Sequence, residues 1–389
     1  MSTIGNLYSS AQLGAPVLSG TAGALKTLLK TCLVDGFGAS PVQSITVTDG
    51  TAVATFASPH PYTAGGPIQI TGAAPAALNG TKRVKAVTSL TVSFDAPGVP
   101  NTTATAGIAA KVPAAGWQEL YPGTANVLCV KPNAPEASGM VLRVDDVGET
   151  GARVRGYEGM SDAHTGVGPC PTVAQAAGSG LFWSKSSAAS GAARAWFLVA
   201  SDRFLYLSVG PIGSQYHTVY FAGDIESFKS GDAWGWMITG DPAAYEVSQS
   251  VAPGCISVSN RAAISSYIGR SYTGVGGAVG ALRVGAGHNG ASNPGISGSA
   301  NYSFGDSPNM AGYGLLLAPV EIVEGPVKRG LLPNALHLTQ NGAGSFPSGE
   351  LVAGTGKFAG HTLLALRTSA ANAQSDTPIG NVFIDLGGA

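Results

Sequence analysis

Hydrophobic residues in this chain fall in short runs separated by glycine, asparagine, aspartate and serine. The densest runs are 196–200 and 204–209, two aromatic and β-branched segments joined by a short polar stretch. Such a pair is typical of a β-hairpin. The runs 218–221 and 233–238 predict two further strands. We therefore expect an antiparallel meander here, with one face buried by a second layer.

One segment near the N-terminus has helical periodicity instead. Its apolar positions recur every three or four residues, and they are Leu25, Leu28, Leu29, Cys32 and Leu33. Ser19 or Thr21 is expected to cap this helix, and Gly36 and Gly38 to end it. An apolar face of this kind needs a covering surface, either a sheet of the same chain or a neighbouring subunit. Leu25, Leu28, Leu29 and Leu33 are our candidate inter-subunit contact, and the polar residues 1–15 are expected to form an arm that reaches a neighbour.

The residue pattern changes from helical spacing to short strand-like runs after the helix, between residues 41 and 113. Asp49-Gly50 and Asn79-Gly80 are strong turn signals between short runs of alternating Thr, Val and Ala. Five or six short strands in about 70 residues indicate a small β-barrel or sandwich inserted after the helix. We expect three parts: an arm and helix at 1–40, a small β-module at 41–113, and a main domain at 114–389.

The main domain is predicted to be an antiparallel β-sandwich or jelly roll. Its later part contains a Gly/Asn/Ser-rich stretch at 274–310, which we expect to form extended loops. A strand is predicted at 313–322, where Pro319 favours an edge or a bulge. The runs 361–367 and 381–386 predict the final two strands. The predicted fold class is therefore mainly β, with one short N-terminal amphipathic helix.

Composition narrows the function classes. Charged residues make up 11% of the chain and the net charge is −1, against about 25% charged residues in an average globular protein. This balance gives no basis for nucleic-acid binding. We expect no membrane span and no secretory signal, since neither a long apolar run nor a basic start followed by an apolar core is present. The four cysteines are widely spaced and predict free thiols rather than a disulfide framework or a zinc site.

A resemblance begins at Ser58-Pro59-His60-Pro61-Tyr62 and continues through Gly65 to Gly80, ending in Pro75-Ala76-Ala77-Leu78-Asn79-Gly80. This stretch resembles a small β-module of tailed-bacteriophage structural proteins. Pro61 replaces the glycine usual in that pattern, and Gly66 replaces the usual aspartate, so His60 is interpreted as a turn or packing residue rather than a ligand. From about Pro16 to the C-terminus, the order of the segments resembles phage and prophage virion structural proteins.

The resemblance implies a structural role rather than a reaction. We expect a non-enzymatic subunit of a tailed-phage virion that binds copies of itself and other virion proteins as a tail, baseplate or collar component. The alternatives are a head decoration or spike protein, or a virion protein that binds a host receptor or surface glycan. The expected location is the virion, assembled in the cytoplasm of the bacterial host. No cofactor is expected.

Candidate catalytic and metal-binding residues are sparse. Asp162 and His164, with Cys170, Asp145 and Asp146 nearby, are a weak candidate metal site, and a capped turn is the preferred interpretation. Asp224 and Glu226 are two apart on a predicted strand, as the acids of a glycosidase are sometimes arranged, but neighbouring acids at a sheet edge are common. We therefore predict no catalytic and no metal-binding residues.

Aromatic side chains offer one further candidate. Trp234 and Trp236 share one face of a predicted strand, and Trp183 is a candidate neighbour. A flat ring can carry the apolar face of a sugar, so these three residues are the candidate glycan platform. The preferred interpretation is that they belong to the core, because aromatic residues at strand spacing are usually buried between sheets.

Overall fold

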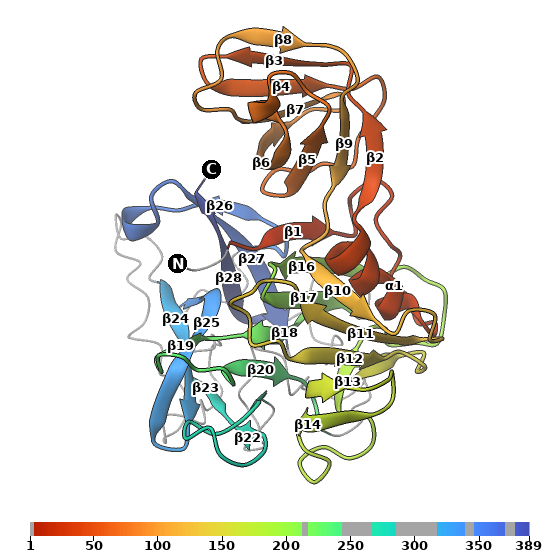
Figure 1. The fold of residues 1–389 in the computed structure, drawn as a ribbon, viewed down its shortest axis with the longest axis vertical. Helices are drawn as coiled ribbons and strands as arrows, with labels where there is room; N and C mark the ends of the chain where they lie inside the picture. The colour runs from red at the N-terminus through yellow and green to blue at the C-terminus, as the bar shows by residue number, and fades with distance from the viewer. Residues whose placement is uncertain are drawn as a thin grey trace.

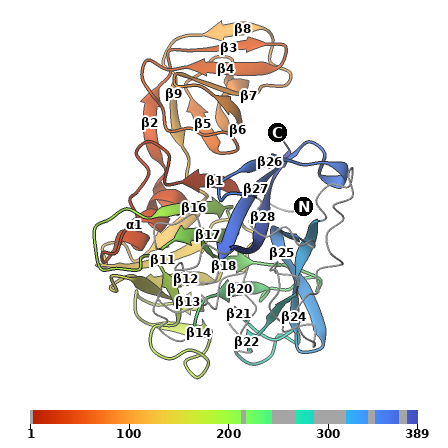
Figure 2. The same cartoon turned by 180° about the vertical axis from the view of Figure 1, so that it is seen from behind.

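The computed structural model describes residues 4–211, 217–242, 266–284, 317–338, 346–369 and 378–388. These residues form four antiparallel sheets and one short α-helix. Three sheets make up the main body and the fourth stands at one end of the molecule (Figures 1 and 2). The predicted mainly β, antiparallel class with one short helix is confirmed.

The first sheet is the middle layer of the body. Its strands, in spatial order, are β1 (Asn6–Ser9), β16 (Ala195–Ala200), β17 (Phe204–Gly210), β18 (Thr218–Asp224), β20 (Trp236–Thr239), β21 (Ser266–Ile268) and β22 (Val279–Gly280). Every residue of β17 and β18 is buried. Leu205 and Leu207 face one hydrophobic cluster, whereas Phe204 and Tyr206 face another. A sheet covered on both faces needs apolar residues at consecutive positions, which explains the apolar run 204–207.

The second sheet covers the first of these faces. It consists of β10 (Trp117–Leu120), β11 (Val127–Pro132), β12 (Val141–Asp145), β13 (Gly151–Met160) and β14 (Gly166–Cys170), and β15 (Leu181–Ser184) pairs with β13. The ring of Trp236 crosses from the middle sheet and lies against Gly156 of β13. A methyl group on Gly156 would lie 2.3 Å from Cζ3 of that ring, so glycine at this position lets the two sheets approach.

The third sheet covers the opposite face. Its spatial order is β23 (Leu282–Val284), β24 (Leu317–Glu324), β25 (Val327–Leu338), β28 (Pro378–Gly388), β27 (His361–Ser369) and β26 (Leu351–Ala353), and β19 (Glu226–Ser227) pairs with β25; a 3₁₀ turn at Gly356–Phe358 follows β26. The hydroxyl of Tyr206 donates a 2.7 Å hydrogen bond to the carbonyl of Pro333 across the interface. The register shifts between Pro319 and Glu321, which confirms the bulge expected at this proline. The body is thus a stack of three sheets, one layer more than a sandwich.

The fourth sheet is the small curled one. Its spatial order is β2 (Phe37–Pro41), β9 (Ala109–Val112), β5 (Pro67–Thr71), β6 (Gly80–Val87), β7 (Thr91–Asp95), β4 (Thr51–Thr55), β3 (Ser44–Thr48) and β8 (Thr102–Ala104), with a 3₁₀ turn at Ala76–Leu78. Asp49 and Gly50 have φ values of 48° and 78°, which confirms the predicted hairpin turn between β3 and β4. Strands β3, β4 and β8 lie farthest from the body (Figure 1).

The small sheet packs on the body of its own chain. Gln12 donates a 3.0 Å hydrogen bond to the carbonyl of Pro61. Gly65 lies close to Leu351 and Leu386, since a methyl group on it would be 3.3 Å from each. Both ends of the chain therefore contribute to the contact with the small sheet.

The helix α1 (Ala24–Lys30) continues as a π-helical turn, Thr31–Asp35, and ends at Gly36 as predicted. The expectation of an inter-subunit helix face is wrong: Leu25, Leu28, Leu29 and Leu33 are fully buried in the core of their own chain. The expected cap is also wrong. Ser19 and Thr21 bond to each other, and the N-cap position is Gly23, which has no side chain.

The expected N-terminal arm is a strand of the middle sheet. β1 pairs with β16, and Leu7 and Tyr8 are buried on its two faces. The Tyr8 hydroxyl donates a 3.0 Å hydrogen bond to the carbonyl of Pro113. Because β1 is paired and buried in this way, it does not extend toward a neighbouring subunit. None of the helices in the described part of the chain has the length and apolar character that crossing a bilayer requires.

Candidate functional site

A cavity of about 680 Å³ lies where the three sheets of the body meet. Its walls come from the loop before β12, the turn between β16 and β17, the end of β18, β19 with the loop that follows it, and β25. The charged residues that line it are Glu136, Arg203, Asp224, Glu226, Lys229 and Asp232. Four acids against two bases favour a cationic or neutral polar ligand over an anion.

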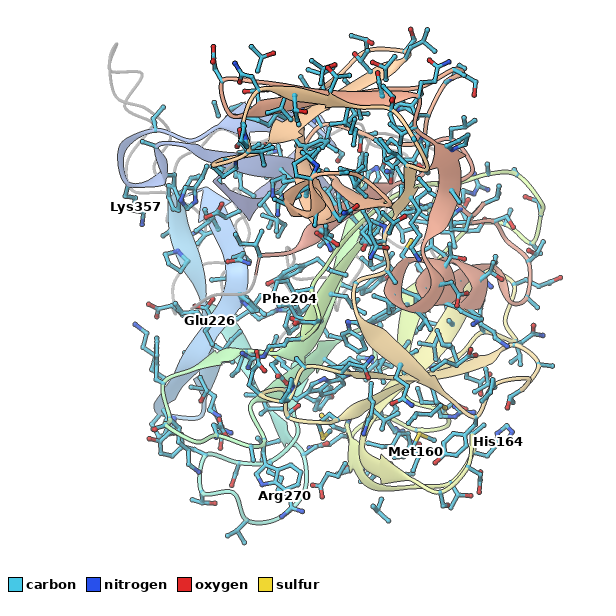
Figure 3. All side chains as sticks on the ribbon, turned by 45° about the horizontal axis from the view of Figure 1, so that its top comes forward. Met160, His164, Phe204, Glu226, Arg270 and Lys357 are labelled. Carbon is cyan, nitrogen blue, oxygen red and sulfur yellow. The ribbon has the colours of Figure 1, made fainter. Side chains whose placement is uncertain are left out.

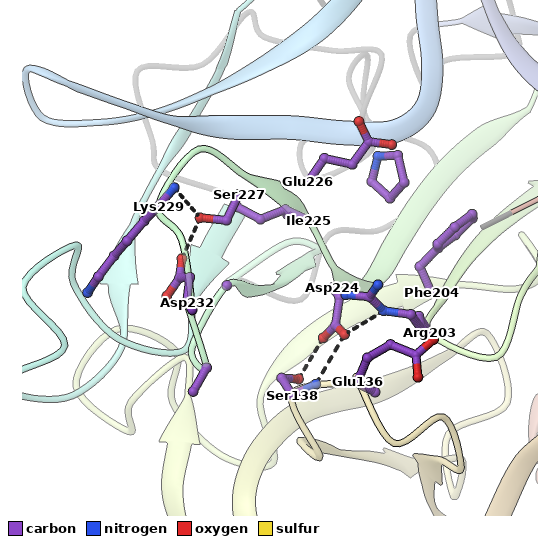
Figure 4. A pocket seen from close by; sticks show the side chains of 15 residues that line it. Glu136, Ser138, Arg203, Phe204, Asp224, Ile225, Glu226, Ser227, Lys229 and Asp232 are labelled. Carbon is purple, nitrogen blue, oxygen red and sulfur yellow. Dashed lines mark hydrogen bonds and ion pairs between the residues drawn. The ribbon is translucent and has the colours of Figure 1, made fainter. Parts of the chain in front are cut away.

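Asp224 is the most firmly held acid of this cavity (Figure 4). Its carboxylate is 6% exposed and accepts hydrogen bonds from the Ser138 amide at 3.1 Å and the Ser138 hydroxyl at 2.6 Å. Arg203 Nε donates a third at 3.2 Å. Ser138 belongs to the second sheet's connecting loop, and Asp224 to the middle sheet. These hydrogen bonds join the second sheet to the middle sheet, which indicates a structural role for Asp224.

Asp232 is held in a similar way on the opposite side of the cavity. It accepts a 2.7 Å hydrogen bond from Ser227 Oγ, and its carboxylate is 2.9 Å from Nη2 of Arg329. Arg329 is fully buried and also pairs with Glu324 at 3.1 Å. This network fixes the loop after β19 against β24 and β25 of the third sheet.

Asp202 stands next to the cavity and Glu136 lines it, and neither is held by a network of this kind. Burial raises the pKa of the Asp202 carboxyl, and the negative charge of Glu136 raises it further. Asp202 Oδ1 is buried and has no hydrogen-bond partner among the described residues. Glu136 is exposed.

Asp224 and Glu226 do not form a facing pair of acids. Ile225 separates β18 from β19, and Figure 4 shows Glu226 directed away from Asp224. Asp224 is already bonded to Ser138 and Arg203. A glycosidase-type arrangement needs both carboxyl groups to flank one bond of the substrate, and this arrangement is not found here.

The candidate metal site around Asp162 is a capped turn. Asp162 Oδ1 accepts hydrogen bonds from the amides of His164 at 2.7 Å and Thr165 at 2.9 Å, and these bonds lower the pKa of the exposed Asp162 carboxyl. Figure 3 shows His164 on the opposite side of the body from Glu226. Cys170 is fully buried, and burial raises the pKa of its thiol. Within the described ranges, no group of three or more His, Cys, Asp or Glu side chains could hold a metal ion.

The candidate glycan platform is not assembled. Trp183 and Trp236 are fully buried in the core between the first two sheets, so their assignment to a platform is wrong. Trp234 precedes β20 and is partly exposed, but the Arg270 guanidinium lies over its ring at 4.1 Å. A strand pattern shows which residues share a face. It does not show that a distant segment covers that face.

Sequence reasoning missed one buried pair that resembles a nucleophile and its base. Ser208 Oγ lies 3.1 Å from Nδ1 of His217, and both residues are at most 3% exposed. Burial lowers the pKa of His217 from its ordinary 6.5 to about 4. The pair lies between the middle and third sheets, with the His217 amide bonded to the carbonyl of Arg367. Because a nucleophile must reach its substrate, burial favours a packing role for this pair.

Comparison with known proteins adds no assignment: no protein-family model matches the chain, and no curated protein matches it in sequence.

Proposed function

We propose that this chain is a non-enzymatic structural subunit of a tailed-phage virion, and that it assembles through β-rich surfaces as a tail, baseplate or collar component. The observation that carries the proposal is the placement of the small sheet. The motif that resembles phage modules supplies the loop that packs on the body, at Pro61 and Gly65. Strands β3, β4 and β8 are consequently directed away from the body (Figure 2).

The outward face of these strands suits contact with another protein. Thr46 pairs with Val53 on one side and with Thr103 on the other, and all three side chains are exposed. Thr48 and Thr51 form the next exposed pair along the same hairpin. A surface of hydroxyl and methyl groups costs less to desolvate than a charged one, and charged residues are depleted from the centres of protein interfaces.

The attachment of the small sheet supports the same role. It is joined to the body by two strands, β2 and β9, and the Arg83 side chain, which also bonds the carbonyl of Gly65 within the module, holds it to the carbonyl of Gly5. An interface that is already fixed in orientation loses little freedom on binding. When many copies form a closed ring or lattice, modest contacts of this kind add up to a stable assembly.

Particle sedimentation tests the proposal. Gradient-purified particles from a producing culture should contain the chain in a constant ratio to the major virion proteins. Val53→Arg should lower that ratio at least tenfold while the purified variant keeps its thermal stability. The matched control is Val167→Arg, at an exposed valine of β14 in the body. A chain that stays in the soluble fraction of a culture rich in particles would overturn the proposal. A monomer bound to heads would favour the decoration alternative.

A further inference from the structure

Lys185 and Asp146 form an ion pair that is completely enclosed. Both side chains are 0% exposed, and Lys185 Nζ lies 2.5 Å from Asp146 Oδ1. Asp146 follows β12 and Lys185 follows β15, and both of these strands pair with β13. Removing two ions from water costs several kcal/mol for each, so such a pair is seldom retained for stability alone.

The remaining polar contacts of the pair come from the segment that leads into α1. Nζ of Lys185 donates a 2.6 Å hydrogen bond to the carbonyl of Thr21. The second carboxyl oxygen, Oδ2 of Asp146, accepts a 2.9 Å hydrogen bond from the amide of Lys26. The Thr21 carbonyl thus accepts from Nζ of Lys185, and the Lys26 amide donates to Oδ2 of Asp146, the carboxyl oxygen that does not contact Nζ.

The backbones of both residues are also fixed. The Lys185 amide donates to the carbonyl of Thr150 at 2.9 Å, and the Asp146 amide donates to the carbonyl of Asn126 at 2.7 Å. The two reactive groups therefore cannot separate without opening the sheet. Holding two groups in contact raises their effective concentration by many orders of magnitude.

The enclosure also makes the charged form of the acid more costly. Burial raises the pKa of the Asp146 carboxyl, although Lys185 and the Lys26 amide oppose this effect. Both side chains are closed off from solvent, and transfer of one proton from the ammonium to the carboxylate during the reaction gives a neutral amine next to a neutral acid. This transfer removes both buried charges.

We propose that Lys185 and Asp146 condense into an intramolecular isopeptide bond. The Nζ lone pair attacks Cγ of Asp146, and the bond from Cγ to Oδ1 breaks. Oδ1 leaves as water with two hydrogens that Nζ carried as an ammonium. The product is one secondary amide and one water molecule, and no oxidant, reductant or other reactant is consumed. During attack, the Lys26 amide stabilises the negative charge that develops on Oδ2.

The surroundings match the product better than they match the ion pair. A secondary amide has one N–H and one carbonyl oxygen. The carbonyl of Thr21 is already placed to accept from that N–H, and the amide of Lys26 is already placed to donate to that oxygen. Condensation would therefore remove two buried charges and leave both polar atoms of the amide hydrogen-bonded.

Intact-mass measurement of the purified, denatured and reduced full chain tests this inference. The expected mass is lower than the sequence mass by one water molecule. A tryptic digest should contain residues 144–153 joined through Lys185 to residues 156–194, uncut after Lys185. A chain with the full sequence mass, and with free 144–153 peptide, would overturn the inference.

Two variants locate the reaction. Lys185→Met should restore the full mass expected for that variant, whereas Lys30→Met, which removes a surface lysine of α1, should still lack one water. A dehydration that persists in Lys185→Met, such as cyclisation at Asp49-Gly50, would contradict the assignment. If Lys185→Met does not fold, the linked peptide of the unmodified chain decides the question alone.

Discussion

Arg83 in β6 of the small sheet donates a 3.2 Å hydrogen bond from Nη2 to the carbonyl of Gly5, which precedes β1 of the body. Its Nη1 donates a 2.9 Å bond to the carbonyl of Gly65. Burial lowers the pKa of this guanidinium, while the nearby Asp385 carboxylate in β28 raises it. One side chain thus connects the small sheet with the segment before β1 and carries its charge near Asp385 of β28.

Replacing Arg83 should loosen the small sheet. Arg83→Met removes two hydrogen bonds from a charged donor, and we expect a loss of about 2 kcal/mol in the free energy of unfolding. Limited proteolysis should cut faster near residues 61–66. Lys85→Met is the control, because Lys85 is exposed and pairs only across the surface with Asp95. If Arg83→Met and Lys85→Met change the free energy of unfolding and the rate of proteolysis equally, Arg83 does not hold the small sheet on the body.

Gly156→Ala tests the contact between the first two sheets. The added methyl group would lie 2.3 Å from Cζ3 of Trp236, and overpacking of this kind costs about 1–3 kcal/mol. Chemical denaturation measures the difference. Gly159→Ala is the matched control in the same strand, since its methyl group would meet Val167 at an ordinary 3.8 Å. If Gly156→Ala leaves the free energy of unfolding unchanged, the sheets are not packed as closely as described.

Asp224→Ala should destabilise the body, because it leaves the Ser138 amide and Arg203 without their shared acceptor. We expect a loss of about 2–3 kcal/mol, since Arg203 is partly exposed and recovers some hydration. Glu136→Ala, in the same cavity, should change stability by less than about 0.5 kcal/mol. The free energies of unfolding of the two variants decide this. A larger loss of stability in Glu136→Ala than in Asp224→Ala would assign the structural role to Glu136.

The burial of His217 predicts how stability depends on pH. Its pKa is about 4 in the fold and 6.5 in the unfolded chain. The unfolded state therefore binds a proton in this interval that the folded state does not, so stability is complete above about pH 6.5 and falls as the pH is lowered. The loss amounts to about 3 kcal/mol and ends near pH 4, where His217 becomes protonated in the fold.

His217→Gln should remove that step from the pH profile. His164→Gln should retain it, because His164 is exposed. The measurement is the free energy of unfolding at intervals from pH 7 to pH 4 for the three proteins. Parallel curves for the unmodified chain and His217→Gln would show that this histidine is not buried in its neutral form.

Local structure was largely predictable from the sequence, because it depends on neighbouring residues. The hairpin of β16 and β17 and the turn at Asp49-Gly50 follow from strand propensity and turn chemistry. For this meander we predicted one buried face and a single covering layer, whereas every residue of β17 is buried. The third sheet, which supplies the other cover, is built mainly from residues after 281.

Long-range contacts were not predictable. The amide of Lys26, in the first turn of the helix, donates its hydrogen bond to the carboxylate of Asp146, which is 120 residues away, so no local capping pattern could reveal it. The burial of Trp183 and Trp236 depends on the pairing of sheets that are separate in the sequence. The predictions for residues 285–310 and 313–316, and for Cys255, lie outside the described residues.

Cryo-electron microscopy of gradient-purified particles is the most direct test of the virion role. We predict symmetry-related copies of the three-layer body, each with the outward strands β3, β4 and β8 in contact with a neighbouring subunit. A complete map of head, collar, tail and baseplate without density for this fold would contradict a structural role in the particle.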